Sequence, residues 1–362
     1  MMGRHADRAQ LQVLPALDLL MHHFKVRWRE DRRNPNGNAL LSVNMRAQAP
    51  EEAYLNLLAG VLTGSAVHCA PETSESEYME CMRPFRNGLK WPAYGTTMAG
   101  HRRLRNVRHL LLQANASGLK GSYAECGVWR GGMSIYAKAV LEVYHLQRQV
   151  YLCDSFQGLP KPRAGSLRSD ETHYSTPAAA HVLSQGEAHV ASNFRAHGVP
   201  FQNVTLVKGF FVDALPAMRA GLLKRGETLS ILRLDGDMYD STIDILYNLY
   251  DLVDVGGYVV VDDFGWDFGT QAGQRAGWGA KDALLDFRAV HGIEDRAHRM
   301  RDIDGSGAWF QKARQVQLGR RKYLEAVARS NYTALQPSPR LTAHDYLRYQ
   351  RAYDRLADSE RA

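Results

Sequence analysis

The chain has 362 residues, 45% of them hydrophobic and 23% charged, as in a globular protein that can bury one large core. Most of its +7 net charge lies in residues 1–36 and 314–362, and the near-neutral centre argues against an extended nucleic-acid-binding face. No apolar run reaches the roughly 18 residues of a membrane span, and Leu11–Leu20 precedes no signal-peptide cleavage site. We therefore expect a cytoplasmic protein without nucleic-acid or membrane partners. Its cysteines should be free thiols: Cys69, Cys81, Cys126 and Cys153.

Three segments are expected from the pattern of the chain. Residues 1–82 are predicted to form a partly helical N-terminal extension, and residues 83–313 the main domain. Residues 314–362 are predicted to be a basic C-terminal tail, in which helical spacing of apolar residues appears only at 346–356.

The segment before the main sheet mixes helical and irregular stretches. Residues 51–68 have apolar positions at helical spacing, and an acidic linker, residues 71–77, follows. Residues 83–95 are rich in aromatic residues, proline and glycine, so we expect an ordered but irregular structure there. Helical periodicity resumes near Thr97.

From Gly121 onward, strand patterns alternate with helical patterns for about 190 residues. The expected strands are Ser122–Val128, Val150–Asp154, Val204–Lys208, Leu229–Asp235 and Tyr258–Asp262. The expected helices are Gly132–His145, His181–His197, Ala214–Leu223, Ser241–Val253, with Asp244 completing a near capping box, and Ala280–Val290. This order predicts an α/β fold with a Rossmann-like, doubly wound, mostly parallel sheet. Asp304-Gly305 between two short apolar runs predicts a C-terminal antiparallel hairpin.

A glycine-rich turn follows the first expected strand in Tyr123-Ala-Glu125-Cys-Gly127 and continues to Gly132. Such a turn lets a ligand approach the backbone and the N-terminus of the next helix, although a turn required only for packing would look the same. Asp154 ends the second strand, where doubly wound folds hold a ribose diol. A carboxylate at Glu125 would repel a pyrophosphate but attract an ammonium group. This favours S-adenosylmethionine over a nicotinamide dinucleotide.

Asp213 follows the third expected strand, where the adenine of such a cofactor would lie. Its carboxylate could accept a hydrogen bond from the adenine amino group, or it could cap the next helix. The sequence leaves both roles open.

Aspartates end the fourth and fifth expected strands, as Asp235-Gly-Asp237 and Asp262-Asp263. The tips of neighbouring parallel strands meet at the ligand-binding edge of a sheet. Carboxylates gathered there would raise one another's pKa unless a cation lies among them, and oxygen ligands suit Mg²⁺, Mn²⁺ or Ca²⁺. A cation that chelates two hydroxyls of an acceptor could hold one in line with a methyl donor, and Asp235 is the candidate base for its proton.

Four ordered motifs resemble the macrocin/mycinamicin-type O-methyltransferases. They are Tyr123–Gly132, Asp154–Pro160, Leu232–Tyr239 and Gly256–Asp263. Residues Thr97, Met98 and Arg103 resemble the N-terminal cap that covers the cofactor in that family.

The resemblance implies a magnesium-dependent class I methyltransferase that acts on a sugar hydroxyl, often on a macrolide. By position it implies Asp235, Asp262 and Asp263 as metal ligands, with Asp237 as an additional acid that supports the ligands or faces the cofactor. The cofactor contacts it implies are Glu125, Gly127, Asp154 and Ser155. It also suggests a homo-oligomer.

Two other functions fit parts of the pattern. A non-catalytic, cofactor-binding partner subunit could keep the fold, although the full set of acids argues against it. A nicotinamide-dependent oxidoreductase is disfavoured by Glu125 and the strand-end aspartates. The acceptor stays open to any glycosylated or polyhydroxylated metabolite, because the glycine- and aromatic-rich loop Gly265–Gly279 should shape its pocket.

Overall fold

The computed structural model of the protein describes residues 49–69, 74–88, 92, 94–163, 170–171, 174–175, 182–265, 279–293 and 296–336. The chain divides into two units, Met1–Ala49 and Pro50–Ala362, and the fold below is that of the second unit. None of the helices in these ranges is long and apolar enough to cross a membrane.

Seven strands build the sheet of the described residues: β1 (Ser122–Cys126), β2 (Val150–Asp154), β3 (Val204–Lys208), β4 (Leu229–Leu234), β5 (Val253–Val261), β6 (Arg301–Asp302) and β7 (Ala308–Gln311). Their order is β3-β2-β1-β4-β5-β7-β6. The first five strands are parallel, and β7 and β6 complete the sheet as an antiparallel hairpin beside β5. The predicted fold class is therefore confirmed.

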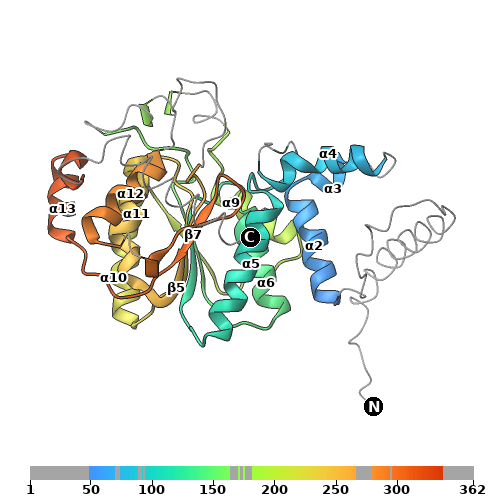
Figure 1. Ribbon diagram of the computed structural model, residues 1–362, viewed down its shortest axis with the longest axis horizontal. Coiled ribbons are helices and arrows are strands. Elements are labelled where there is room, and N and C mark those ends of the chain that lie inside the picture. The colour runs from blue at the N-terminus through green and yellow to red at the C-terminus, as the bar shows by residue number, and fades with distance from the viewer. Residues whose placement is uncertain are drawn as a thin grey trace, which may run out of the picture. The chain divides into compact units, whose positions relative to one another are not determined.

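The helices of the described residues are α2 (Pro50–Leu62), α3 (Ser65–His68), α4 (Glu75–Arg86), α5 (His101–Ala116), α6 (Gly132–Val143), α9 (Glu187–Ala196), α10 (Phe211–Arg225), α11 (Tyr239–Leu249), α12 (Gly279–His291) and α13 (Arg320–Ala328). Short 3₁₀ turns are η2 (Tyr250–Leu252), η3 (Arg296–His298) and η4 (Tyr332–Leu335). Figure 1 shows α5 and α6 on one side of the strands and α10 to α12 on the other.

Two apolar cores hold these layers together, because successive strand residues face opposite sides of the sheet. In β4, Ile231 belongs to the core with α2, α5, α6 and α9, whereas Leu232 belongs to the core with α10 to α13. Helix α2 lies before residue 83, and α13 lies after residue 313, yet both contribute buried residues to these cores. The predicted boundaries at 82/83 and 313/314 stay predictions.

Some local expectations are wrong. Cys69 and Cys81 are joined by a disulfide between α3 and α4, and only Cys126 and Cys153, both buried, are free. The expected acidic linker ends early, because Ser74 and Glu77 form a capping box that starts α4.

The end of the chain also differs from expectation. α11 begins at Tyr239, with Met238 as its N-cap residue, so Ser241 is not a helix cap. The segment after residue 313 contains α13, which buries Tyr323 against Tyr247 of α11, rather than a tail alone. The helix expected near 346–356 lies outside the described residues.

Asp244 is buried where α11 meets α13. Its Oδ1 accepts hydrogen bonds from the hydroxyls of Tyr323 (2.9 Å) and Tyr332 (2.6 Å), and Arg163 lies 2.9 Å from Oδ2. Burial raises the pKa of Asp244 from 3.8 to about 6, against the opposing effect of Arg163 and these hydrogen bonds. The folded state thus binds the Asp244 proton more tightly than the unfolded state does.

This shift predicts a pH-dependent loss of stability. Stability from this group is present below pH 4 and is lost as the pH rises through about 6, a change worth ~3 kcal/mol. Relative to Asp244→Asn, the wild-type free energy of unfolding should fall by that amount between pH 4 and pH 6.5 and then level off. Urea unfolding at fixed pH values measures it, and a constant difference across the range would contradict it.

Candidate active site

The site lies where the sheet changes its direction of winding. Strands β1 to β3 extend one way and β4 and β5 the other, so the reversal falls between β1 and β4. Open parallel sheets bind ligands at this point, beyond the carboxyl ends of the strands. A cavity of about 300 Å³ opens there, lined by the strand ends, by Thr97 and Met98 before α5, and by Phe210 and Phe211 at the start of α10.

Gly127 allows the first and fourth strand ends to meet. Its φ is +96°, and a Cβ atom at this position would overlap the carbonyl oxygen of Asp235. The Gly127 backbone N–H donates to Cys153 at 2.9 Å, while Asp235 N–H donates to Cys126 at 2.8 Å. A side chain would push the glycine turn away from the acidic edge.

Asp154 holds the glycine turn by its backbone. Its Oδ2 accepts from the N–H groups of Val128 (2.6 Å) and Trp129 (3.3 Å), and its Oδ1 accepts from Phe156 N–H (2.7 Å). Asp154 and Ser155 both line the cavity. A carboxylate has about four lone-pair positions, so this arrangement leaves room for the predicted contact with a ribose.

Glu125 is buried at the end of β1, and both of its oxygens have protein partners. Oε1 pairs with Arg233 at 2.7 Å, and Oε2 accepts from Ser134 and from the hydroxyl of Tyr123 (3.4 Å). Burial raises the pKa of Glu125 to about 7, although Arg233 opposes the rise. Its predicted contact with the cofactor depends on the lone pairs that these partners leave free.

Asp213 is the one predicted cofactor contact that the structure does not bring to the cavity. It is exposed in the first turn of α10, where Phe210, not Asp213, is the N-cap residue. Phe210 and Phe211 line the cavity at that point instead. All the other predicted site residues line the cavity: Thr97, Met98, Glu125, Gly127, Asp154, Ser155, Asp235, Asp237, Asp262 and Asp263.

Three aspartates converge at the edge of the cavity. Asp235, Asp237 and Asp263 each place a carboxylate oxygen within 4.8 Å of the others, a grouping that could hold a metal ion. Asp237 adopts a φ of +57°, which is uncommon for a residue other than glycine and directs the chain back toward the cluster. The structure thus assembles two of the three predicted ligands with Asp237 beside them.

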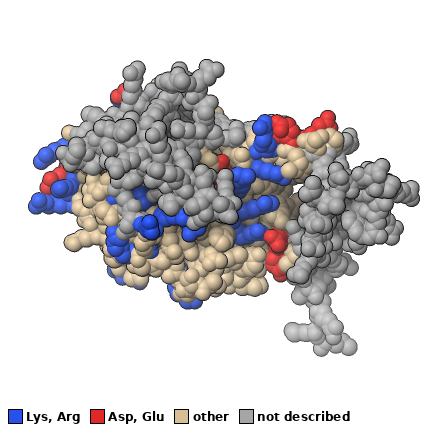
Figure 2. Space-filling model, in the orientation of Figure 1, with Lys and Arg blue, Asp and Glu red and all other residues tan. Residues whose placement is uncertain are grey.

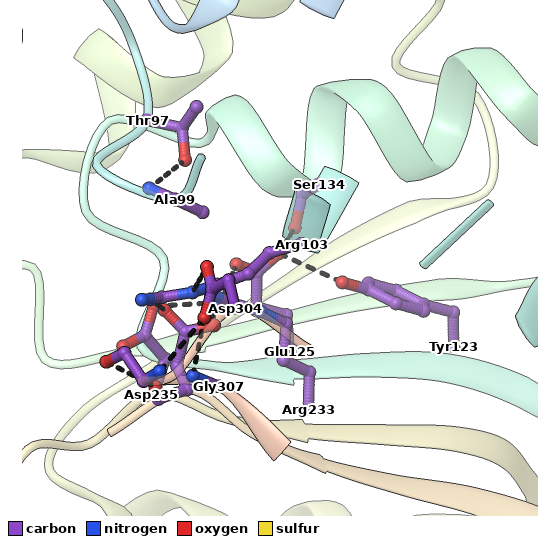
Figure 3. A network of polar contacts seen from close by, with 12 residues as sticks. Thr97, Ala99, Arg103, Tyr123, Glu125, Ser134, Arg233, Asp235, Asp304 and Gly307 are labelled. Carbon is purple, nitrogen blue, oxygen red and sulfur yellow. Dashed lines mark hydrogen bonds and ion pairs between the residues drawn. The ribbon is translucent and has the colours of Figure 1, made fainter. Parts of the chain in front are cut away.

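Asp262 lies next to this cluster but pairs with two arginines. Its Oδ2 is 2.6 Å from Nη1 of Arg103, and its Oδ1 is 2.6 Å from Nη2 of Arg233. Arg233 also pairs with Asp235 at 2.8 Å (Figure 3). Burial alone would raise the pKa of Asp262, but the two guanidinium groups outweigh it and lower the pKa.

For Asp235 and Asp263, positive charge does not outweigh the effect of burial. Burial, followed by the charge of neighbouring acids, raises the pKa of Asp235 to about 8 despite Arg233, and raises that of Asp263 well above its usual range. Oδ2 of Asp263 is buried and has no hydrogen-bond partner among the described residues. Oxygen donors with excess negative charge and one buried orphan oxygen fit a hard divalent cation.

Sequence reasoning missed Arg233 and assigned Arg103 only to the cap over the cofactor, not to a pair with Asp262. Arg233 interrupts the buried run Ile231-Leu-Arg-Leu, and that interruption was the available signal, because a buried charge requires a partner. Ser134 and Asp304 carried no signal, since their roles depend on elements that only the fold brings together.

The family of the chain follows from comparison with known proteins. A model of the macrocin O-methyltransferases (TylF) covers residues 46–312. The chain belongs to this family. The predicted family membership is thereby confirmed, and the chain is an enzyme, an S-adenosylmethionine-dependent O-methyltransferase.

This macrocin O-methyltransferase is similar to O-methyltransferases of Streptomyces and Micromonospora. The chain is 35% identical over 272 residues to demethyldecarbamoylnovobiocin O-methyltransferase of Streptomyces niveus, and the match covers 72% of this chain and 94% of the relative. It is 34% identical over 265 residues to the 8-demethyl-8-(2,3-dimethoxy-alpha-L-rhamnosyl)-tetracenomycin-C 4'-O-methyltransferase of Streptomyces olivaceus, covering 72% and 92%. Mycinamicin III 3''-O-methyltransferase of Micromonospora griseorubida is 31% identical, with 72% and 97% covered.

A solved structure shows the same architecture. The O-methyltransferase NovP superimposes with a TM-score of 0.60 at 32% identity, covering 73% of this chain and all of NovP (100%). These similarities favour neither a nicotinamide-dependent oxidoreductase nor a non-catalytic subunit.

Proposed function

We propose that the enzyme methylates a hydroxyl on the sugar of a glycosylated natural product, with Mg²⁺ bound beside the cofactor. The observation that carries this proposal is the convergence of Asp235, Asp237 and Asp263 next to the cavity, with a buried unpartnered oxygen on Asp263. The names of the tetracenomycin and mycinamicin relatives support the sugar acceptor, since both specify a methylated position on an attached sugar. A homo-oligomer and a cytoplasmic location stay predictions.

Asp235 and Asp263 are the ligands for which the support is strongest, because they belong both to the predicted set and to the assembled cluster. Asp262, the third predicted ligand, can bind a cation only with lone pairs that Arg103 and Arg233 leave free. Asp237 offers its carboxylate at the same place.

The residues of the chain divide the remaining work. A bound Mg²⁺ would supply positive charge that lowers the pKa of the acceptor hydroxyl. Bound S-adenosylmethionine would supply the methyl group. Asp235 would accept the proton of the acceptor hydroxyl, which leaves its oxygen able to receive that group. Asp154 and Ser155 would hold the ribose, Glu125 the amino group, and Thr97 and Met98 would cover the cofactor and exclude water, since all of them line the cavity.

A labelled-methyl assay tests this function. The purified enzyme is incubated with methyl-labelled S-adenosylmethionine and glycosylated acceptors such as mycinamicin III, with Mg²⁺ or with EDTA. We expect label on the sugar with Mg²⁺ and none with EDTA. Transfer that persists unchanged in EDTA would rule out the metal, and label on an aglycone hydroxyl would rule out the sugar as acceptor.

A further inference from the structure

Arg103 differs from Arg102 and Arg105, the nearest arginines of α5, because its side chain is buried. Figure 2 shows Lys and Arg side chains gathered on the face that α5 shares with the β6–β7 hairpin, and Arg102 and Arg105 are exposed members of α5. The side chain of Arg103, by contrast, is only 8% exposed. A buried guanidinium is costly unless it is fully paired, so its partners indicate what it does.

Two acids from different elements pair with Arg103. Nη1 lies 2.6 Å from Asp262 at the end of β5. Nε lies 2.8 Å from Oδ2 of Asp304 in the β6–β7 loop (Figure 3). The loop is itself tied to β5, since Ser306 accepts at 2.8 Å from the backbone N–H of Gly265. Arg103 therefore connects three elements: α5, the end of β5 with its proposed metal-binding acids, and the β6–β7 loop.

Two glycines enclose the guanidinium. A Cβ atom on Gly307 would lie 3.2 Å from Nε of Arg103, and one on Gly88 would lie 3.5 Å from Nη2. The first contact leaves little space, so the guanidinium is closely packed between the two backbones. Its rigid planar donors can hold two carboxylates in a fixed orientation, whereas the ammonium of a lysine is a point charge without that geometry.

The segment that leads into α5 lines the cavity. Its residues Thr97 and Met98 lie just before Gly100, the N-cap residue of α5, and Arg103 N–H donates to Gly100 at 3.0 Å. This segment is also joined to the glycine turn, because Gly132 N–H donates to Thr96 at 3.0 Å. A shift of Thr97 and Met98 would therefore move Arg103 and, through it, Asp262.

From this connection we propose that Arg103 is a positioning residue that couples the binding of the cofactor to the binding of the divalent cation. The inference rests on the proposed function, because it requires both ligands. When the cofactor fixes Thr97 and Met98, α5 holds Arg103 against Asp262, and the adjacent Asp263 keeps its oxygen directed into the acidic cluster. By linkage, the cation must then tighten cofactor binding by the same factor.

Calorimetry of Mg²⁺ binding with and without S-adenosylhomocysteine measures the coupling. We expect the product to tighten Mg²⁺ binding on the order of tenfold in the wild type, a common size for coupling between sites. In Arg103→Met this ratio should fall close to one. Loss of a positive charge near the acids would by itself strengthen Mg²⁺ binding, so the ratio, not the affinity, is the readout.

Asp304→Asn provides a second variant that keeps the loop. Its Oδ1 can still accept from the N–H groups of Ser306 (3.1 Å) and Gly307 (2.9 Å), while the charge facing Arg103 is lost. Arg219→Met is the matched control, because it removes a largely buried ion pair between α10 and Asp251, on the side of the sheet opposite α5. We expect reduced coupling in the first and wild-type coupling in the second.

Each outcome bears on the proposal. A wild type without coupling, or coupling that persists in both Arg103→Met and Asp304→Asn, would overturn it. Loss of coupling in Arg219→Met would show that general destabilisation is the cause and would also overturn it. Absence of any Mg²⁺ or S-adenosylhomocysteine binding by the wild type would instead overturn the proposed function itself.

Discussion

Asp263→Asn should lower the rate of Mg²⁺-dependent methyl transfer on the order of a thousandfold. The substitution removes one negative charge and one ligand oxygen from the acidic cluster, and metal stabilisation of a developing charge is worth several kcal/mol. S-adenosylhomocysteine affinity should stay within a few fold, because Asp263 belongs to the acidic cluster and not to the glycine turn. Single-turnover assays and calorimetry measure the two quantities separately.

Two more substitutions identify the third ligand. Asp262→Asn should abolish Mg²⁺-dependent transfer while cofactor affinity changes only a few fold. Asp237→Asn should weaken Mg²⁺ binding to a similar extent only if Asp237 coordinates the ion. Asp254→Asn, at the opposite end of β5, is the control. If Asp263→Asn and the control have equal rates and equal Mg²⁺ affinities, the acidic cluster is not the metal site.

Gly127→Ala should destabilise the enzyme on the order of 4 kcal/mol and prevent cofactor binding. A Cβ atom would overlap the Asp235 carbonyl oxygen, and the φ of +96° disfavours any side chain. The glycine turn and the acidic edge would have to move apart to remove this overlap, and that movement would disrupt the cavity that both of them line. Urea unfolding and titration with S-adenosylhomocysteine measure the two effects.

Gly118→Ala separates overlap from backbone strain. Gly118 also has a positive φ of +74°, but nothing lies within 4 Å of a Cβ atom placed there. Its substitution should therefore cost only the 1–2 kcal/mol of the left-handed conformation, roughly, and leave cofactor binding intact. Equal losses at the two glycines would contradict the proposed close approach of the strand ends.

The sheet could be predicted from the sequence because its central strands β1, β2 and β4 are buried almost throughout and helical patterns separate the parallel strands. The segments Val150–Asp154 and Val204–Lys208 match β2 and β3 residue for residue. The acidic edge could be predicted too, since carboxyl ends of parallel strands share one edge and Asp235, Asp262 and Asp263 follow such strands directly.

The charge balance within that edge could not be predicted in the same way. Arg103 lies 159 residues from Asp262 and 201 residues from Asp304, and only the packing of α5 against β5 brings them together. Local spacing therefore identified the acids but not the two arginines that form ion pairs with Asp262. The Cys69–Cys81 disulfide was missed for a related reason, since two separate helices position the two thiols.

The most direct test of the account is a calorimetric titration of the wild-type enzyme with S-adenosylhomocysteine and with NAD, each with and without Mg²⁺. The account predicts that S-adenosylhomocysteine binds, that NAD does not, and that Mg²⁺ binds to the S-adenosylhomocysteine complex. Binding of NAD alone, or a complex with S-adenosylhomocysteine that takes up no Mg²⁺, would contradict it.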